Sequence, residues 1–109
     1  MPLYMLQATY TPEAWAALAK NPTNRSEAIS ALLSKAGGRL ISLYNCFGEY
    51  DAVVIIDMPD DTAAAAVSIA AQAAGHLKMA KTTRMFTAEE GVEAMRKAGG
   101  LTLQTPLSQ

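Results

Sequence analysis

The chain has one cysteine and one histidine among its 109 residues. A single cysteine, Cys46, excludes an internal disulfide and favours a cytoplasmic protein. The lone histidine, His76, has no second histidine or spaced cysteine to complete a zinc site, which usually needs four ligands. The sequence therefore predicts neither a metal site nor a bound cofactor.

Charge is also scarce. Charged residues make up 17% of the chain and the net charge is −1, whereas about 25% is usual for soluble domains. A net charge this close to zero indicates binding neither to nucleic acid nor to an anionic membrane surface. No apolar run approaches the roughly 20 residues that span a bilayer. The shortage of charge instead indicates that part of the surface is buried against another subunit, so we expect a homodimer or higher oligomer.

Two runs rich in β-branched and aromatic residues, 40–47 and 52–56, lie at the centre of the chain. Such composition fits a pleated sheet, and the short connection between the runs predicts an antiparallel hairpin. Gly48 is expected to supply the unusual backbone angles of that connection. The second run is apolar at every position, so we expect both of its faces to be covered.

The chain before the hairpin indicates one strand and one interrupted helix. Residues 3–10 have the two-residue alternation of a strand. Thr11-Pro12 begins a helix as cap and first-turn proline, and Asn21-Pro22 interrupts it. Residues 24–27 have the spacing of a capping box. The helix then resumes, because residues 29–36 carry apolar side chains at i, i+3, i+4 and i+7.

The chain after the hairpin indicates two helices and one strand. A helix is predicted for residues 62–74, and its buried side is nearly all alanine, so we expect it to pack closely on the sheet. Residues 77–86 predict a strand whose charged side chains suit a sheet edge. Thr87 and Glu90 form a second capping box, which opens a helix over residues 88–98.

The predicted order, βαββαβ with an extra C-terminal helix, is that of an α+β, ferredoxin-like fold. Right-handed crossovers place both internal helices on one face of a four-stranded antiparallel sheet. The other face stays open although residues 52–56 are apolar on both sides, and a large exposed apolar patch is usually an interface. Two sheets packed face to face would then form a dimeric α/β barrel. We assign residues 1–98 to one domain and residues 99–109 to a C-terminal tail.

Several spaced motifs resemble those of the GYD-domain family over about residues 3–90. They are Arg25-Ser26-Glu27-Ala28, Gly48-Glu49-Tyr50-Asp51, Pro59-Asp60-Asp61, Gly75 and Thr83-Arg84-Met85-Phe86-Thr87. The resemblance implies a dimeric α/β barrel and no defined activity. The wider barrel group includes cofactor-free oxygenases, isomerases, haem proteins and ligand-binding regulatory domains, and the fold does not choose among them.

Four residues are candidates for binding a ligand: Trp15, Arg25, Tyr50 and Asp51. An arginine beside aromatic walls suits a carboxylate-bearing aromatic or lipid-like molecule. We expect the pocket between the sheet and the interrupted helix, because the alanine-rich helix is expected to leave no room beneath it. The alternative is structural: Arg25 would lie exposed in a first helical turn, and the aromatic residues would belong to the core.

Three residues are candidates for catalysis: Tyr50, Asp51 and His76. A carboxylate beside a phenol, or an imidazole, can move a proton. Structural alternatives exist here too. Asp51 can accept hydrogen bonds from turn amides, Tyr50 can plug an edge of the core, and His76 can be a loop residue after a helix. We expect Cys46 to be a small apolar side chain in a strand, because a nucleophilic cysteine would need an oriented base.

Three functions follow as hypotheses. The first is a homodimeric binding or regulatory module that holds a small apolar or aromatic molecule. The second is a small cofactor-independent enzyme, oxygenase- or isomerase-like, that acts on a similar molecule. The third, a haem binder, depends on His76 alone. Neither nucleic acid nor a membrane is expected as a partner.

Overall fold

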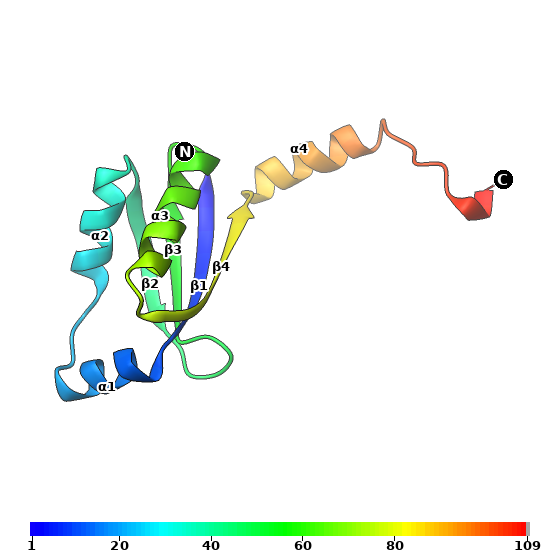
Figure 1. Ribbon diagram of the computed structural model, residues 1–109. Coiled ribbons are helices and arrows are strands. Elements are labelled where there is room, and N and C mark those ends of the chain that lie inside the picture. Colours follow the sequence, from blue (N-terminus) through cyan, green and yellow to red (C-terminus); the bar gives the residue numbers. More distant parts are fainter. Residues whose placement is uncertain (109) are drawn as a thin grey trace.

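The computed structural model describes residues 1–108, and the order of elements confirms the α+β, ferredoxin-like prediction (Figure 1). The elements are β1 Leu3–Tyr10, α1 Pro12–Lys20, α2 Ser26–Lys35, β2 Arg39–Asn45, β3 Ala52–Asp57, α3 Asp61–Ala73, β4 Leu77–Met85, α4 Ala88–Ala98 and a short 3₁₀ turn, Pro106–Ser108.

The four strands form one antiparallel sheet in the order β2-β3-β1-β4. The two central strands are β1 and β3, and β4 lies at an edge, as its charged side chains predict. Helices α2 and α3 both cover the same face of the sheet (Figure 1). The ferredoxin-like topology therefore leaves one sheet face without helices.

The register of the sheet decides which residues meet the helices. Tyr4 pairs with Ile56 and Leu6 with Val54, and all four lie in or against the buried core on the helix side. Because side chains alternate along a strand, Val53 and its neighbours of the same parity point to the opposite face. That open face carries a row of apolar residues: Leu3, Met5, Val53, Ile55, Met79 and Met85.

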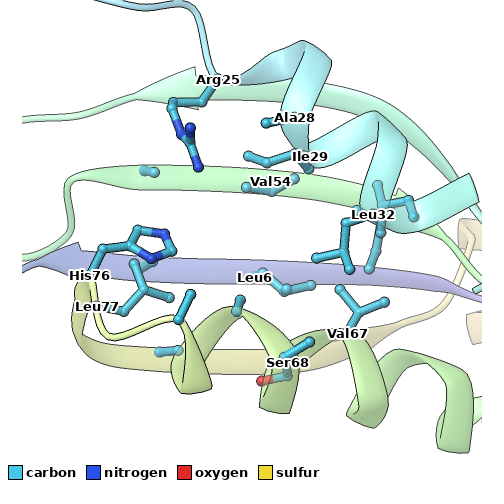
Figure 2. Close-up of a pocket in the computed structure, with 18 of the residues that line it drawn as sticks. Leu6, Arg25, Ala28, Ile29, Leu32, Val54, Val67, Ser68, His76 and Leu77 are labelled. Atoms are coloured by element: carbon cyan, nitrogen blue, oxygen red, sulfur yellow. The ribbon is translucent and has the colours of Figure 1, made fainter. Parts of the chain in front are cut away.

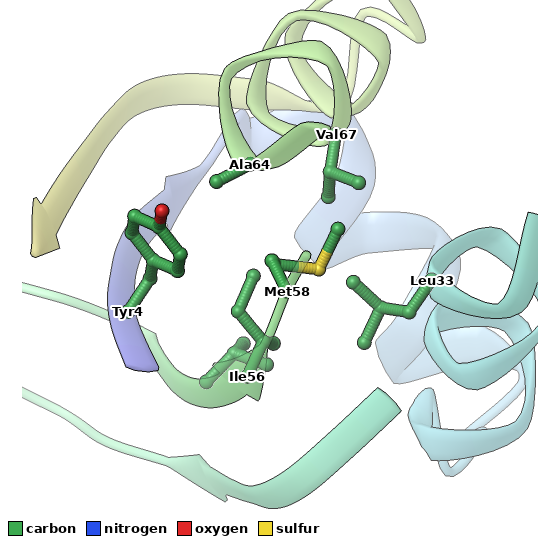
Figure 3. Close-up of a cluster of buried hydrophobic side chains, with 7 residues drawn as sticks. Tyr4, Leu33, Ile56, Met58, Ala64 and Val67 are labelled. Atoms are coloured by element: carbon green, nitrogen blue, oxygen red, sulfur yellow. The ribbon is translucent and has the colours of Figure 1, made fainter. Parts of the chain in front are cut away.

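The core lies between the sheet and the two covering helices (Figure 3). Leu33 of α2, Ile56 of β3 and Met58 just after β3 are fully buried. Val67 of α3 packs against this group. An unbranched methionine adapts to an irregular gap, and here Met58 fills the space between the two helices at one end of the sheet.

The predicted helix caps are largely confirmed. The Thr11 hydroxyl accepts a hydrogen bond from Ala14 N at 3.1 Å. Thr87 and Glu90 form the reciprocal capping box at the start of α4. The box predicted for residues 24–27 is wrong. Arg25 occupies the cap position of α2 without a side-chain bond, because the side chain of the preceding asparagine instead accepts from the backbone N–H of Ser26.

The expectation for Gly48 is also wrong. Positive φ angles occur at Gly37 (80°) and Gly75 (86°), and at no other position among residues 1–108. These two glycines follow α2 and α3, where the left-handed conformation ends a helix. The connection between β2 and β3 spans six residues, 46–51, and a loop of that length turns without a left-handed residue at Gly48.

Two helices, α1 and α4, contain no buried residue. Helix α1 lies across one end of the sheet. Helix α4 leads away from the sheet, which makes the molecule long, 62 × 31 × 22 Å (Figure 1). Its apolar residues Val92 and Met95 are exposed. None of the helices in residues 1–108 is long and apolar enough to cross a membrane.

Candidate functional site

A cavity of about 310 Å³ lies between α2, α3 and the covered face of the sheet (Figure 2). Its volume is in the range of small-molecule sites, roughly 300–1,000 Å³. The walls are mainly aliphatic, with Leu6, Ile29, Leu32, Val54, Val67 and Ala71 among the residues that line it. Such a lining favours a hydrocarbon group over a polar one.

The cavity exists because α3 is rich in alanine. Ala64 and Val67, in the first half of α3, belong to the packed core and fix the helix against it. Ala70, Ala71 and Ala74 further along line the cavity, and their side chains are too short to fill the space beneath them. The expectation that this helix leaves no room under it is therefore wrong.

The charged and ionisable groups gather at one end of the cavity. Arg25, at the start of α2, and His76, just before β4, point toward the same opening (Figure 2). The imidazole of His76 stacks on the ring of Tyr10, with centroids 6.1 Å apart and an interplanar angle of 28°. Burial raises the pKa of the Tyr10 hydroxyl, so this group stays a neutral phenol near pH 7.

Arg25 is a half-buried residue, and its side chain has no protein partner among the described residues. Within residues 1–108, its guanidinium makes no ion pair and no side-chain hydrogen bond. A partly desolvated cation is costly unless an anion pairs with it. A planar guanidinium is suited to bind a carboxylate through two hydrogen bonds at once. Among the described residues, the mouth of the cavity therefore carries a positive charge without an anionic partner.

Asp51 serves the architecture of this region. Its Oδ2 accepts hydrogen bonds from the Tyr10 backbone N–H at 2.9 Å and from Trp15 Nε1 at 3.2 Å. Its own N–H donates to the Ala8 carbonyl at 2.8 Å. The carboxylate thus ties α1 to the end of β1, and it holds the indole edge-on to the Tyr10 ring, with centroids 5.2 Å apart.

The sequence-based candidates therefore separate in space. Arg25 lines the cavity, while Trp15 lies in a neighbouring cleft. Tyr50 is half-buried in the loop after β2 and lines neither space. His76 has no carboxylate within hydrogen-bond distance among the described residues. Within residues 1–108, no side-chain hydrogen bond joins Tyr50, Asp51 and His76 to one another, and their catalytic roles stay predictions.

Comparison with known proteins identifies the family. The sequence model of the GYD domain matches residues 4–95. The chain belongs to the GYD domain family. None of the curated proteins compared with this GYD domain matches it.

Two solved structures are similar to this GYD domain. The protein TTHA0845 from Thermus thermophilus superposes with a TM-score of 0.53 at 15% identity, covering 81% of this chain and 96% of that one. A NIPSNAP domain protein from Burkholderia xenovorans gives a TM-score of 0.47 at 12% identity, covering 81% and 95% of the two chains. At this identity, the first similarity shows the fold alone.

The sequence indicates His76 as a candidate residue but does not predict that it lies beside Tyr10 at the mouth of the GYD domain cavity. The signal that joins them is the pairing of β1 with β4, in which Tyr10 lies opposite Leu77. The Thr11 N–H then donates to the His76 carbonyl at 3.1 Å. Strand order in a ferredoxin-like sheet implies this neighbourhood, but the position of the ring depends on packing.

No group of three or more His, Cys, Asp or Glu side chains in the described part of this GYD domain is arranged to hold a metal ion. Cys46 is half-buried and lines the cleft that contains Trp15. The chemistry available at the cavity mouth is therefore one permanent cation, one imidazole and one phenol.

The charge state of His76 is a direct test of this geometry. Desolvation, together with the nearby Arg25 cation, lowers the pKa of His76 from its usual 6.5. Because the chain has one histidine, its ring protons are resolved in an NMR titration. We expect a pKa below 6.5 in the wild type and a partial rise in Arg25→Gln, since desolvation remains.

Lys20→Gln removes an exposed cation of α1 that lines neither space, and it serves as the control, with an unchanged His76 pKa. A wild-type pKa at or above 6.5, or equal values in wild type and Arg25→Gln, would show that the guanidinium does not face the imidazole.

Proposed function

We propose that this GYD domain is a homodimeric small-molecule-binding module, and that its ligand is an apolar molecule with one acidic group. The observation that carries the proposal is the Arg25 guanidinium at the mouth of an aliphatic cavity, which has no ion pair or side-chain hydrogen bond within residues 1–108. The hydrocarbon part enters the cavity, and the acid remains at the mouth on the arginine.

Two neighbours of Arg25 support an acidic group. A neutral His76 imidazole can donate one hydrogen bond to a carboxylate. A bound anion also favours the imidazolium, so it raises the pKa of His76 from its lowered value in the free protein. In addition, α2 begins at Ser26, and the positive end of its dipole points toward the same opening. Both the His76 imidazole and the N-terminus of α2 therefore favour an anion beside Arg25.

The homodimer is proposed from the open sheet face. This face exposes Tyr44 and Met79 and carries the apolar row defined above. An apolar surface of this kind is a common protein interface, and a two-fold pair of sheets would cover it. The cavity lies on the opposite, helix-covered side of the sheet, so dimerisation and ligand binding do not compete.

The proposal predicts that octanoate binds and that Arg25 carries much of its affinity. A hydrogen bond to a charged group contributes about 1.5–3 kcal/mol, so Arg25→Gln should weaken binding by roughly 10- to 100-fold. Isothermal titration calorimetry measures this directly. Lys20→Gln again serves as the matched control and should bind like the wild type.

A second variant tests the cavity itself. Ala71→Phe places a ring in the space that the hydrocarbon needs, and it should reduce octanoate affinity while Arg25 stays in place. Octanoate that binds equally well to wild type, Arg25→Gln and Ala71→Phe would contradict this site. A Soret band in the purified protein that is lost in His76→Gln would instead support the haem hypothesis.

A further inference from the structure

A second hollow adjoins the cavity. This outer cleft, of about 410 Å³, lies beside α1 and the loop after β2. The two spaces share Tyr10 and Arg25 as wall residues.

The two spaces differ in chemistry. Apart from Tyr10 and His76 at its mouth, the inner cavity has no aromatic residue in its lining, and most of its walls are aliphatic. The outer cleft has Trp15 and Phe47 in addition to Tyr10, with Leu18 and Pro22 beside them. Aromatic rings pack favourably in edge-to-face and offset geometries. The inner space thus fits an alkyl group, and the outer one fits an aromatic ring.

The aromatic walls differ in how firmly they are held. Asp51 Oδ2 accepts hydrogen bonds from both Trp15 Nε1 and the Tyr10 backbone, so the indole is fixed at the cleft before any ligand arrives. Phe47, in contrast, is a fully exposed residue, with a relative exposure of 102%. A phenylalanine that is wholly in water at the edge of a fixed aromatic cleft gains burial when a ring is inserted beside it.

We propose that the ligand is an aryl-substituted apolar acid, in which the carboxylate lies between an alkyl chain and an aromatic ring. The carboxylate binds Arg25, the alkyl chain occupies the inner cavity, and the ring lies in the outer cleft against Trp15 and Phe47. This inference rests on the proposed function and specifies its ligand class.

Three probes separate the contributions: octanoate, phenylacetate and 2-phenyloctanoate, which carries both groups on the carbon next to the carboxylate. Burying a ring against aromatic walls is worth about 1.5 kcal/mol or more, so we expect 2-phenyloctanoate to bind at least about tenfold more tightly than octanoate. Trp15 is the only tryptophan, so its fluorescence reports on the outer cleft. It should respond to the two aryl acids more than to octanoate.

Phe47→Ala should remove most of the gain of 2-phenyloctanoate and leave octanoate affinity unchanged. Because Phe47 is fully exposed, this change does not disturb the core. Phe86→Ala is the matched control, since Phe86 is also exposed but follows β4 and lines none of the spaces near Arg25.

Equal affinity for octanoate and 2-phenyloctanoate, with both still dependent on Arg25, would overturn the outer site and leave the proposed function standing. A tenfold gain that persists in Phe47→Ala without any change in Trp15 fluorescence would also overturn it. Failure of octanoate itself to bind would count against the proposed function.

Discussion

Gly38→Ala should lower the free energy of unfolding by about 3 kcal/mol, as expected for strong overpacking of a core. A Cβ at this position would overlap Met58 Sδ and would lie 2.6 Å from the Asp57 carbonyl oxygen. Met58 is fully buried, and the carbonyl belongs to the backbone at the end of β3, so neither neighbour moves aside easily. Urea unfolding followed by circular dichroism measures the loss.

Gly48→Ala is the matched control. A Cβ at Gly48 meets no atom within 4 Å, and its φ is not positive. Both substitutions restrict the unfolded chain equally, so the difference between them isolates the native contact. We expect Gly48→Ala to stay within about 0.5 kcal/mol of the wild type. Equal stability of the two variants would mean that residues 38 and 58 are not in close contact.

Val53→Lys should convert a dimer into a folded monomer. Val53 lies on the open sheet face, where a lysine would place a charge in the middle of the proposed interface, and burying an unpaired charge is strongly unfavourable. If the interface has the usual size for an obligate dimer, association buries about 2,000 Å² or more of accessible surface. Light scattering at micromolar concentration gives the mass, and circular dichroism shows that the monomer is folded.

Two further variants complete this experiment. Ile69→Lys adds the same charge at an exposed position of α3, on the other side of the sheet, and should leave the dimer intact. Val54→Lys places the charge in the buried core and should unfold the protein. A wild type that is monomeric and well folded, or a Val53→Lys protein that stays dimeric, would show that this face is not the interface.

Much of the fold is predictable from local chemistry. The Thr11 and Thr87 side chains accept hydrogen bonds from backbone N–H groups of the first turn, and Pro12 lacks an N–H that would have no partner there. These local effects begin a helix in any tertiary context. The alternation of residues 3–10 and the apolar run 52–56 likewise place the two central strands. Gly48 fails as a prediction because a hairpin loop of six residues has many turn geometries, and sequence alone does not select one.

The site is less predictable because its shape depends on tertiary packing. The sequence predicts Arg25 as a pocket residue because it is a charged residue that follows a helix interruption, and Arg25 does line the cavity. The alanines of α3 are compatible with close packing on the sheet and equally with a void beneath the helix. The tertiary structure decides between these interpretations, because it places Ala64 and Val67 in the core and later alanines along the cavity. Asp51 Oδ2 accepts hydrogen bonds from the Tyr10 N–H and Trp15 Nε1, which gives the residue a structural role. Its predicted role in ligand binding stays a prediction.

The most direct test of the central claim compares three ligands that share one alkyl chain and differ only in their head group. The claim is that an aliphatic cavity ends at an unpaired cation, so charge decides affinity. We predict that octanoate binds the wild-type protein most tightly, that octanol binds more weakly, and that octylammonium binds least, as measured by calorimetry at pH 7. Equal affinity for the three, or preference for octylammonium, would contradict an anion site at Arg25.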